Sequence, residues 1–288
     1  MSTPSDSRSE LHHTYVVQDR SNDEELTRLQ IQDKLATTGM GGVFSEQPDP
    51  TAFRRVLDVG CGPGGWIIEA AKSYPNLQVL IGIDASSKMI EYARQQATAE
   101  GVDDRVEFHV MDALRMLEFP HKYFDVVNHR AAFSWLRTWD WPKLLQEYLR
   151  VCRPGGIIRA TEANFIKESS SPALTQLVQL TIQAMYNAGH YFALQGDGVI
   201  SHLAAVLQRS GVQNVQTRTY TLNYRAGTPE WQGFFDDERH LFHVIRPFLL
   251  KWARVPDDYE EIYQQSLIEM QQPDFVGTVE VLTAWGNK

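Results

Sequence analysis

A short apolar run that ends in a cluster of glycines constrains this chain more than any other feature. Residues 54–59 (RRVLDV) predict a buried strand, residues 60–65 (GCGPGG) follow it, and residues 66–73 (WIIEAAKS) predict a helix. Glycine has no Cβ, so the backbone there can turn tightly and approach a ligand closely. The free N–H groups of the first helical turn would then face that ligand. This strand–turn–helix unit is typical of the ligand-binding edge of a parallel sheet.

Strand-like and helix-like segments keep alternating after the glycine turn. Apolar runs predict strands around residues 78–83, 106–110, 124–127 and 157–161. Amphipathic segments between them predict helices, one capped by Ser86 and one at residues 142–151. Strand–helix units repeated at this spacing imply an α/β chain in which helices cover both faces of a parallel sheet.

The C-terminal part of the chain is less regular. Residues 173–188 and 199–209 predict amphipathic helices, and residues 214–223 and 275–285 predict two late strands. Roughly fifty residues separate these two strands, which is too many for a hairpin loop. That stretch predicts helices at residues 229–251 and 257–271. We interpret it as a helical insertion, and insertions of this size are often lids.

The glycines alone do not identify the ligand. Gly60, Gly62 and Gly65 satisfy the G-x-G-x-x-G pattern of nicotinamide-dependent oxidoreductases, but that pattern by itself is weak. A glycine-rich turn without a ligand is the structural alternative. Asp58, two residues before the first glycine, would repel a pyrophosphate but suits a cationic amino group. The context therefore argues against a dinucleotide.

Three acidic residues mark the ends of three successive predicted strands. Asp84 ends the second strand, where an acid can accept both hydroxyls of a ribose. Asp112 ends the third strand next to Ala113, as an edge contact for a base should. Together with Asp58, these positions describe a ligand with an ammonium, a ribose and a base but no phosphates. S-adenosylmethionine fits that description.

At this point the sequence resembles a known family, the class I S-adenosylmethionine-dependent methyltransferases. The similar segments are VLDVGCGPGG, IGIDAS, VMDAL, FDVVNHRAAF and LRVCRPGGIIRATE, which lie in order between residues 54 and 162. Within the class, the chain looks most like the small-molecule branch of quinone-biosynthesis and secondary-metabolite enzymes. The resemblance implies a Rossmann-like, doubly wound α/β fold. Its seven-stranded, mostly parallel sheet would have an antiparallel last strand, and the helical lid insertion is added to it.

The resemblance also implies a set of cofactor-binding residues. The glycine turn and Asp58 would hold the methionine part, Asp84 the ribose, and Asp112 the adenine edge. In the N-terminal segment, a Tyr and an Arg of some relatives close over the cofactor, although a surface helix with a Glu24–Arg28 pair is the alternative. The implied set is Tyr15, Arg28, Gln32, Asp58, Gly60, Cys61, Gly62, Gly64, Asp84, Ala85, Met89, Asp112, Ala113 and Asn128.

The acceptor side is harder to read from the sequence. Methyl transfer from a sulfonium depends mainly on positioning and desolvation, but some acceptors need a base near their proton. His129 and His190 are the candidates for that base, and for each the alternative is a structural hydrogen-bonding histidine. His240 and His243 lie three residues apart on a predicted helix, but no further ligands complete a set, so no metal site is predicted.

The predicted insertion is rich in aromatic residues. A pocket for a small molecule is mostly apolar with a few polar anchors, so these rings suit an apolar or aromatic acceptor. Trp231 and Phe235 are our candidates for binding it. We therefore divide the chain into residues 1–50, an N-terminal tail and cofactor-closing helix; residues 51–224 and 273–288, the S-adenosylmethionine-binding domain; and residues 225–272, the helical lid.

Composition narrows the choice of partner. The net charge is −9, and the fourth strand is followed by NHRAAF rather than the N/D-P-P-Y/F run that accompanies methylation of base amino groups. Both observations argue against nucleic acid as the substrate. The polar start MSTPSDSRSE, two cysteines and the lack of a long apolar run lead us to expect a cytoplasmic protein without a membrane span.

The sequence-based hypothesis is methyl transfer from S-adenosylmethionine to a small organic molecule. An NAD(P)-dependent oxidoreductase and a non-catalytic, cofactor-binding regulatory protein are the alternatives. The acceptor, the atom that is methylated and the oligomeric state are left open.

Overall fold

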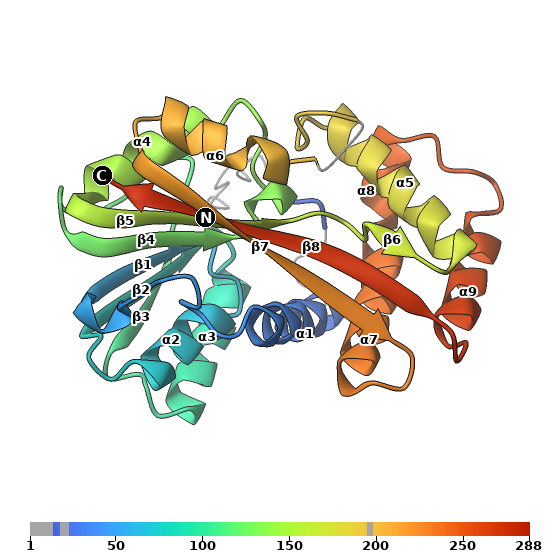
Figure 1. Ribbon diagram of the computed structural model, residues 1–288, viewed down its shortest axis with the longest axis horizontal. Helices are drawn as coiled ribbons and strands as arrows, with labels where there is room; N and C mark the ends of the chain where they lie inside the picture. The colour runs from blue at the N-terminus through green and yellow to red at the C-terminus, as the bar shows by residue number, and fades with distance from the viewer. Residues whose placement is uncertain (1–13, 18–22, 195–197) are drawn as a thin grey trace, which may run out of the picture.

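A single mixed sheet forms the centre of the fold (Figure 1). The computed structural model describes residues 14–17, 23–194 and 198–288; residues 1–13 and 18–22 of the predicted N-terminal tail lie outside these ranges. The strands are β1 (Arg55–Val59), β2 (Val79–Asp84), β3 (Val106–Val110), β4 (Phe124–Arg130), β5 (Cys152–Ala163), β6 (Glu168–Ser169), β7 (Gln213–Arg225) and β8 (Val276–Asn287). The sheet order is β3-β2-β1-β4-β5-β8, and β7 pairs with the other edge of β8.

The direction of the strands matches the fold class expected from the sequence. Strands β1 to β5 pair in parallel, whereas β8 is antiparallel to both β5 and β7. The Rossmann-like sheet with an antiparallel last strand is thereby confirmed. The described residues also contain a short additional strand, β6, which pairs with β8 and was not predicted.

Helices cover both faces of this sheet. They are α1 (Asp23–Gly39), α2 (Gly65–Ser73), α3 (Ser87–Ala99), α4 (Trp141–Val151), α5 (Pro172–Asn187), α6 (Ile200–Arg209), α7 (Pro229–Val244), α8 (Arg246–Trp252) and α9 (Tyr259–Met270), with 3-10 turns η1 (Pro50–Ala52) and η2 (Ala132–Ser134). Figure 1 shows α1, α2 and α3 on one side of the sheet and α4 and α6 on the other.

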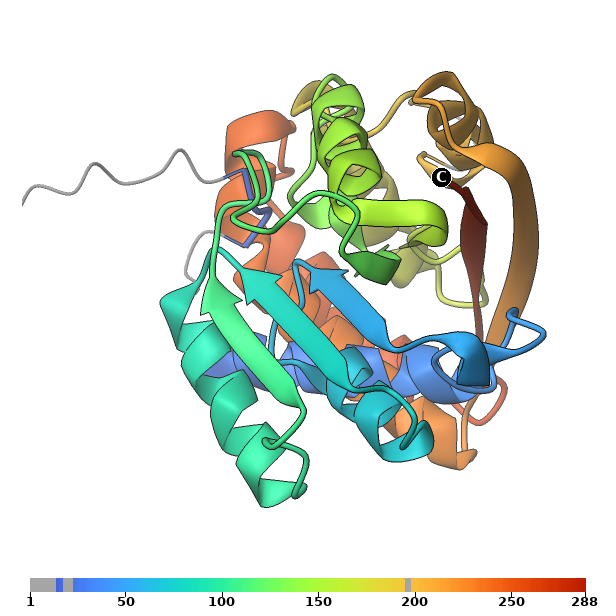
Figure 2. The ribbon, with the colours of Figure 1, turned by 90° about the vertical axis from the view of Figure 1, so that its left-hand side faces the viewer.

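Alternation along β1 explains why both faces need a cover. Val56 belongs to the apolar cluster formed with α2 and α3, and its neighbour Leu57 belongs to the cluster formed with α4. Successive side chains of a strand point to opposite faces, so an apolar run such as Val56–Leu57 buries both sides of the sheet. The parallel strands end at one common edge, as the arrowheads of β1, β2 and β3 show in Figure 2.

A helical lobe extends the sheet at its far end (Figure 1). Helices α7, α8 and α9 lie in sequence between β7 and β8, where the insertion was predicted. The helix predicted at residues 229–251 is in fact two helices, divided at Ile245. Pro247, in the first turn of α8, has no N–H to continue the hydrogen-bond ladder of α7. Helix α7 packs against α1, so the lobe contacts the N-terminal helix.

In the described part of the chain, no helix combines the length and the apolar character that crossing a bilayer requires.

Candidate active site

One pocket of about 310 Å³ lies at the carboxyl ends of the parallel strands. Asp58, Asp84, Arg130 and Glu162 line it from β1, β2, β4 and β5, and Asp112 lines it from the loop after β3. Parallel strands bring their carboxyl ends to the same edge, so residues far apart in sequence meet in one crevice. The pocket continues from this edge to the lobe, where β7, β8 and α7 also contribute lining residues.

The glycine turn forms part of the pocket wall. Gly60 and Gly62 line the pocket and have left-handed backbone angles, with φ of 68° and 53°. A Cβ on Gly62 would meet nothing within 4 Å, whereas one on Gly60 would meet the indole of Trp135 at 3.1 Å. Gly64 is not a lining residue. It is the N-cap residue of α2, with φ of 82°, and a Cβ there would collide with Phe108.

Asp58 lies at the bottom of the pocket and is almost fully buried, with 3% of its surface exposed. Burial raises its pKa to about 7. Asn128 Nδ2 donates a hydrogen bond of 2.7 Å to Asp58 Oδ1, and Asn128 Oδ1 accepts one of 2.7 Å from Arg159. Arg159 in turn pairs with Glu46 at 2.8 Å. Asn128, expected beside the ligand, therefore lies behind Asp58 and supports it.

Asp84 and Asp112 organise the loops that follow their strands. Asp84 Oδ2 accepts a hydrogen bond from the Gly62 N–H at 3.1 Å, and its Oδ1 accepts one from Ser86 at 2.8 Å. Asp112 Oδ1 accepts a hydrogen bond from the Leu114 N–H at 2.9 Å. These bonds fix the orientation of both carboxylates at the pocket wall. Four further residues of the sequence-based set also line the pocket: Cys61, Ala85, Met89 and Ala113.

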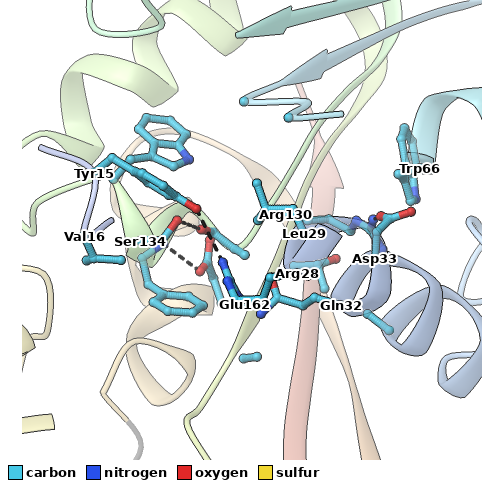
Figure 3. A pocket seen from close by; sticks show the side chains of 18 of the residues that line it. Tyr15, Val16, Arg28, Leu29, Gln32, Asp33, Trp66, Arg130, Ser134 and Glu162 are labelled. Atoms are coloured by element: carbon cyan, nitrogen blue, oxygen red, sulfur yellow. Dashed lines mark hydrogen bonds and ion pairs between the residues drawn. The ribbon is translucent and has the colours of Figure 1, made fainter. Parts of the chain in front are cut away.

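The N-terminal segment and α1 close one side of the pocket. Tyr15, Arg28 and Gln32 are lining residues, as the sequence suggested, and Figure 3 shows them around the same space as Arg130 and Glu162. Arg28 is buried and pairs with Glu25 at 2.8 Å. The segment is attached to the body of the protein by a 2.9 Å hydrogen bond from the Val16 N–H to the Ser134 carbonyl oxygen.

Neither histidine proposed as a base lines the pocket. His129 is fully buried on β4, with Nδ1 3.1 Å from the Tyr148 hydroxyl and Nε2 3.2 Å from Glu162 Oε1. His190 Nδ1 lies 2.8 Å from the Phe133 carbonyl oxygen, and burial lowers the pKa of His190 to about 4. Both rings lie outside the pocket lining, and their role as general bases stays a prediction.

The two aromatic residues proposed for the acceptor also lie outside the pocket lining. Trp231 donates from Nε1 to the Met270 carbonyl oxygen at 2.9 Å, and its ring stacks on Phe235 with centroids 5.6 Å apart. The ring of α7 that does line the pocket is Phe234, which stacks on Tyr224 at 4.4 Å. The aromatic content of the insertion was visible in the sequence, but the rotation of the helix was not.

Several lining residues were missed by the sequence analysis. Glu162, fully buried, accepts hydrogen bonds from the N–H groups of Ala132 at 2.9 Å and Phe133 at 3.0 Å, and so holds η2 at the pocket. Its position at the end of the segment LRVCRPGGIIRATE was an available signal. Arg130 pairs with Asp33 and donates to Thr37 Oγ1 at 3.0 Å. Further missed polar residues include Asn164, Asp237 and Glu238.

No metal site is visible in the described ranges, since no group of three or more His, Cys, Asp or Glu side chains converges there. His243 Nδ1 lies 3.0 Å from Glu24 Oε2, and His240 Nδ1 lies 3.8 Å from the same carboxylate. These histidines are therefore at the contact between α7 and α1.

Comparisons with known proteins agree with this geometry. A family profile described as a methyltransferase domain matches residues 56–156. The chain is 30% identical over 188 residues to a demethylmenaquinone methyltransferase of Lactiplantibacillus plantarum, and the alignment covers 61% of this chain and 78% of that protein. It is 37% identical over 117 residues to ajmaline N-methyltransferase of Rauvolfia serpentina, which covers 40% of this chain and 38% of that protein.

Other matches cover less of the partner proteins. For several curated methyltransferases, the matched part is between 25% and 48% of their length. Among solved structures, phosphoethanolamine N-methyltransferase 2 of Haemonchus contortus in complex with S-adenosyl-L-methionine shares the fold. Its TM-score is 0.55 at 19% identity, and the superposition covers 98% of this chain and 61% of that one.

Proposed function

The chain belongs to the class I S-adenosylmethionine-dependent methyltransferases, and from this premise we propose that it transfers a methyl group from S-adenosylmethionine to a small organic acceptor. The observation that carries the proposal is one pocket with two chemically different halves. Asp58, Asp84 and Asp112 line one half beside the glycine turn, and apolar residues from η2, the segment after β5, β7, α7 and β8 line the other.

The polar half of the pocket suits the cofactor. Asp58 would hold its ammonium group, and Arg130, which lines the same space, would face its carboxylate. Asp84 ends β2 at the position where an acid accepts ribose hydroxyls. The open space beside Gly62 lets the backbone approach the ligand closely, because no Cβ fills it.

The bound cofactor would supply a methyl group that the positive sulfur already activates. The protein then has to align the acceptor with this methyl group and exclude water, since positioning and desolvation supply most of the catalysis. Tyr15 and Arg28 cover the pocket from the N-terminal side, and Phe234 and Leu241 cover it from α7. These elements have the placement needed to separate the reacting groups from solvent.

The apolar half of the pocket suits an apolar or aromatic acceptor. It is lined by aromatic and aliphatic side chains from η2, the segment after β5, β7, α7 and β8: Phe133, Phe165, Leu222, Tyr224, Phe234, Leu241, Val279 and Val281. Pockets for small molecules have this composition, with few polar groups to fix the orientation. The lid assigned to residues 225–272 would thus contribute to the acceptor side through α7.

The acidic residue beside the glycine turn argues against the oxidoreductase alternative, because the buried Asp58 carboxyl group would lie beside the pyrophosphate of a dinucleotide.

For the location of the protein we propose the cytoplasm, because Cys61 and Cys152 are both free, as a reducing compartment would keep them. The net charge of −9 supports a small molecule rather than nucleic acid as the partner.

Two measurements test the proposal. Calorimetry should show binding of S-adenosylmethionine and of its demethylated product, and no binding of NAD or NADP. A turnover assay with methyl-labelled donor over a panel of small acceptors should show label transfer, which separates an enzyme from a non-catalytic binding protein. Dinucleotide binding without adenosylmethionine binding would overturn the proposal.

A further inference from the structure

One face of α7 is part of the pocket wall. Phe234, Asp237, Glu238 and Leu241 line the pocket, and they follow the spacing i, i+3, i+4, i+7 of a single helix face. The face thus brings two carboxyl groups into a surface that is otherwise apolar. A buried carboxyl group is costly unless it is paired, so these two positions need a chemical explanation.

The protein supplies too little positive charge for this region. Arg28 lies among three buried acids and pairs with Glu25 at 2.8 Å and with Asp237 at 3.2 Å. Glu238 is the third of these acids, and its Oε2 atom is buried and makes no hydrogen bond with any residue that the structure describes. Burial, together with the neighbouring Asp237 charge, raises the pKa of Glu238. A ligand with a positive charge would supply the partner that Glu238 lacks.

A second lining residue also has a buried oxygen atom without a hydrogen-bond partner among the described residues. Asn164 Oδ1 is also buried without a hydrogen-bond partner in the described part of the chain. Both orphaned atoms, a carboxylate oxygen and an amide oxygen, are hydrogen-bond acceptors. An ammonium group offers three donors and no acceptor, so it suits the Glu238 carboxyl group, whereas a carboxylate or phosphate would be repelled.

The aromatic side chains that line the pocket indicate what kind of molecule would carry the ammonium group. Tyr224 and Phe234 stack at 4.4 Å on one side of the pocket, and Phe133 and Phe165 lie with ring centroids 5.8 Å apart on another. Rings of this kind accommodate an apolar or aromatic body and also favour a nearby cation.

We propose that the methyl acceptor is an amine on an apolar or aromatic body, and that Glu238 binds its ammonium group. The inference rests on the proposed function and adds the substrate class. Glu238 would take one proton from the ammonium and free the nitrogen lone pair. That lone pair forms the new bond to the methyl carbon while the carbon–sulfur bond breaks and its electron pair stays on sulfur. The product is an N-methylated ammonium, and the proton on Glu238 passes to solvent.

Paired probes on the full-length chain test this assignment. Tryptamine and tryptophol, and phenethylamine and 2-phenylethanol, differ within each pair only in an amine or a hydroxyl group. With the protein saturated by S-adenosylhomocysteine, calorimetry should show that the amine of at least one pair binds at least tenfold more tightly than its alcohol. Binding of neither amine, or equal binding of amine and alcohol, overturns the inference.

A variant tests the residue itself. Glu238→Gln should remove the preference for the amine, while the affinity for S-adenosylmethionine stays within about twofold. Glu230→Gln, an exposed Glu→Gln change on the same helix, is the matched control and should behave as the wild type. If Glu238→Gln weakens cofactor binding instead, Glu238 belongs to the cofactor half and the inference fails.

These outcomes also separate the two proposals. Absence of S-adenosylmethionine binding in the wild type would remove the proposed function and this inference together. Binding of the cofactor with methyl transfer only to neutral or acidic acceptors would remove this inference alone. Thermal melts confirm folding of both variants, and Glu238→Gln should not melt earlier, because it replaces a buried carboxyl group that has no hydrogen-bond partner among the described residues.

Discussion

Asn128 Nδ2 donates a 2.7 Å hydrogen bond to Asp58 Oδ1, and this bond joins the bottom of the pocket to the buried ion pair of Arg159 and Glu46. All three supporting side chains lie behind the pocket rather than in it. The orientation of Asp58 thus depends on residues from β4, β5 and the loop before β1. This chain of contacts connects the stability of the sheet with binding at the glycine turn.

The buried ion pair between Arg159 and Glu46 should be important for stability. In Arg159→Met, Glu46 keeps its buried charge and loses its partner, so we expect a loss of about 3–5 kcal/mol in the free energy of unfolding. Urea denaturation measures it. Lys72→Met, which breaks the exposed pair with Glu100, is the control and should cost less than about 1 kcal/mol. Equal effects of the two variants would contradict the importance assigned to the buried pair.

Asp58 should make stability depend on pH. Its pKa rises from 3.8 to about 7 through burial, so the folded protein retains a proton that the unfolded chain releases at lower pH. The contribution of this group is complete below about pH 4 and is lost as pH rises through about 7. The free energy of unfolding of Asp58→Asn should therefore fall less between about pH 4 and pH 7 than that of the wild type. Urea denaturation at several pH values measures this difference. Parallel curves for the two proteins would refute the shift.

The same pKa predicts proton release on cofactor binding. An ammonium group favours the charged carboxylate, so Asp58 should lose its proton when S-adenosylmethionine binds near pH 6. Affinity should then increase with pH until about 7. Calorimetry in buffers of different ionisation enthalpy would detect the released proton, and Asp58→Asn should abolish the release. A heat that is independent of the buffer would speak against ammonium binding at Asp58.

Asp84→Ala should weaken cofactor binding without unfolding the protein. The variant would lose charge-assisted hydrogen bonds to the ribose, worth about 1.5–3 kcal/mol, which corresponds to a loss of affinity between about 10- and 150-fold. Asp104→Ala, an exposed acid in the loop before β3, serves as the control. Unchanged affinity in a folded Asp84→Ala variant would remove Asp84 from the site.

The rings of α7 should divide into two groups. Phe234 lines the pocket, so Phe234→Leu should raise the KM for the acceptor and leave cofactor affinity nearly unchanged. Trp231 packs on Phe235 and bonds to Met270, so Trp231→Ala should mainly lower the melting temperature. Steady-state kinetics and thermal melts of both variants decide this. The assignment fails if Trp231→Ala changes the acceptor KM and Phe234→Leu does not.

The part of the pocket around the glycine turn, where we propose that the cofactor binds, could be predicted from the sequence because its signals are local. The glycine turn, Asp58 and Asp84 each lie at the end of a strand, and parallel strands place their ends at one edge whatever the details of packing. All of the predicted cofactor residues except Gly64 and Asn128 line the pocket. Those two residues do not line the pocket for local reasons: Gly64 is the N-cap of α2, and Asn128 is turned toward Asp58 and Arg159.

The residues that line the part of the pocket proposed for the acceptor could be identified only from the tertiary structure. Neighbouring residues on a helix point about 100° apart, so the packing of α7 on α1 and β7 decides that Phe234 and Glu238 face the pocket while Phe235 does not. Trp231 lies one turn before Phe234 on the same side of α7, where it bonds to Met270 outside the pocket lining. His129 and Glu162 show the same dependence, since Glu162 lines the pocket and His129 lies beside Glu162 outside the lining. The sequence alone determined the sheet, its ligand edge and the cofactor chemistry, because strand period and turn chemistry act within a few residues. Which side chains of α7 line the pocket was set by contacts between segments far apart in sequence, as in the pair of Arg28 and Asp237, which are 209 residues apart.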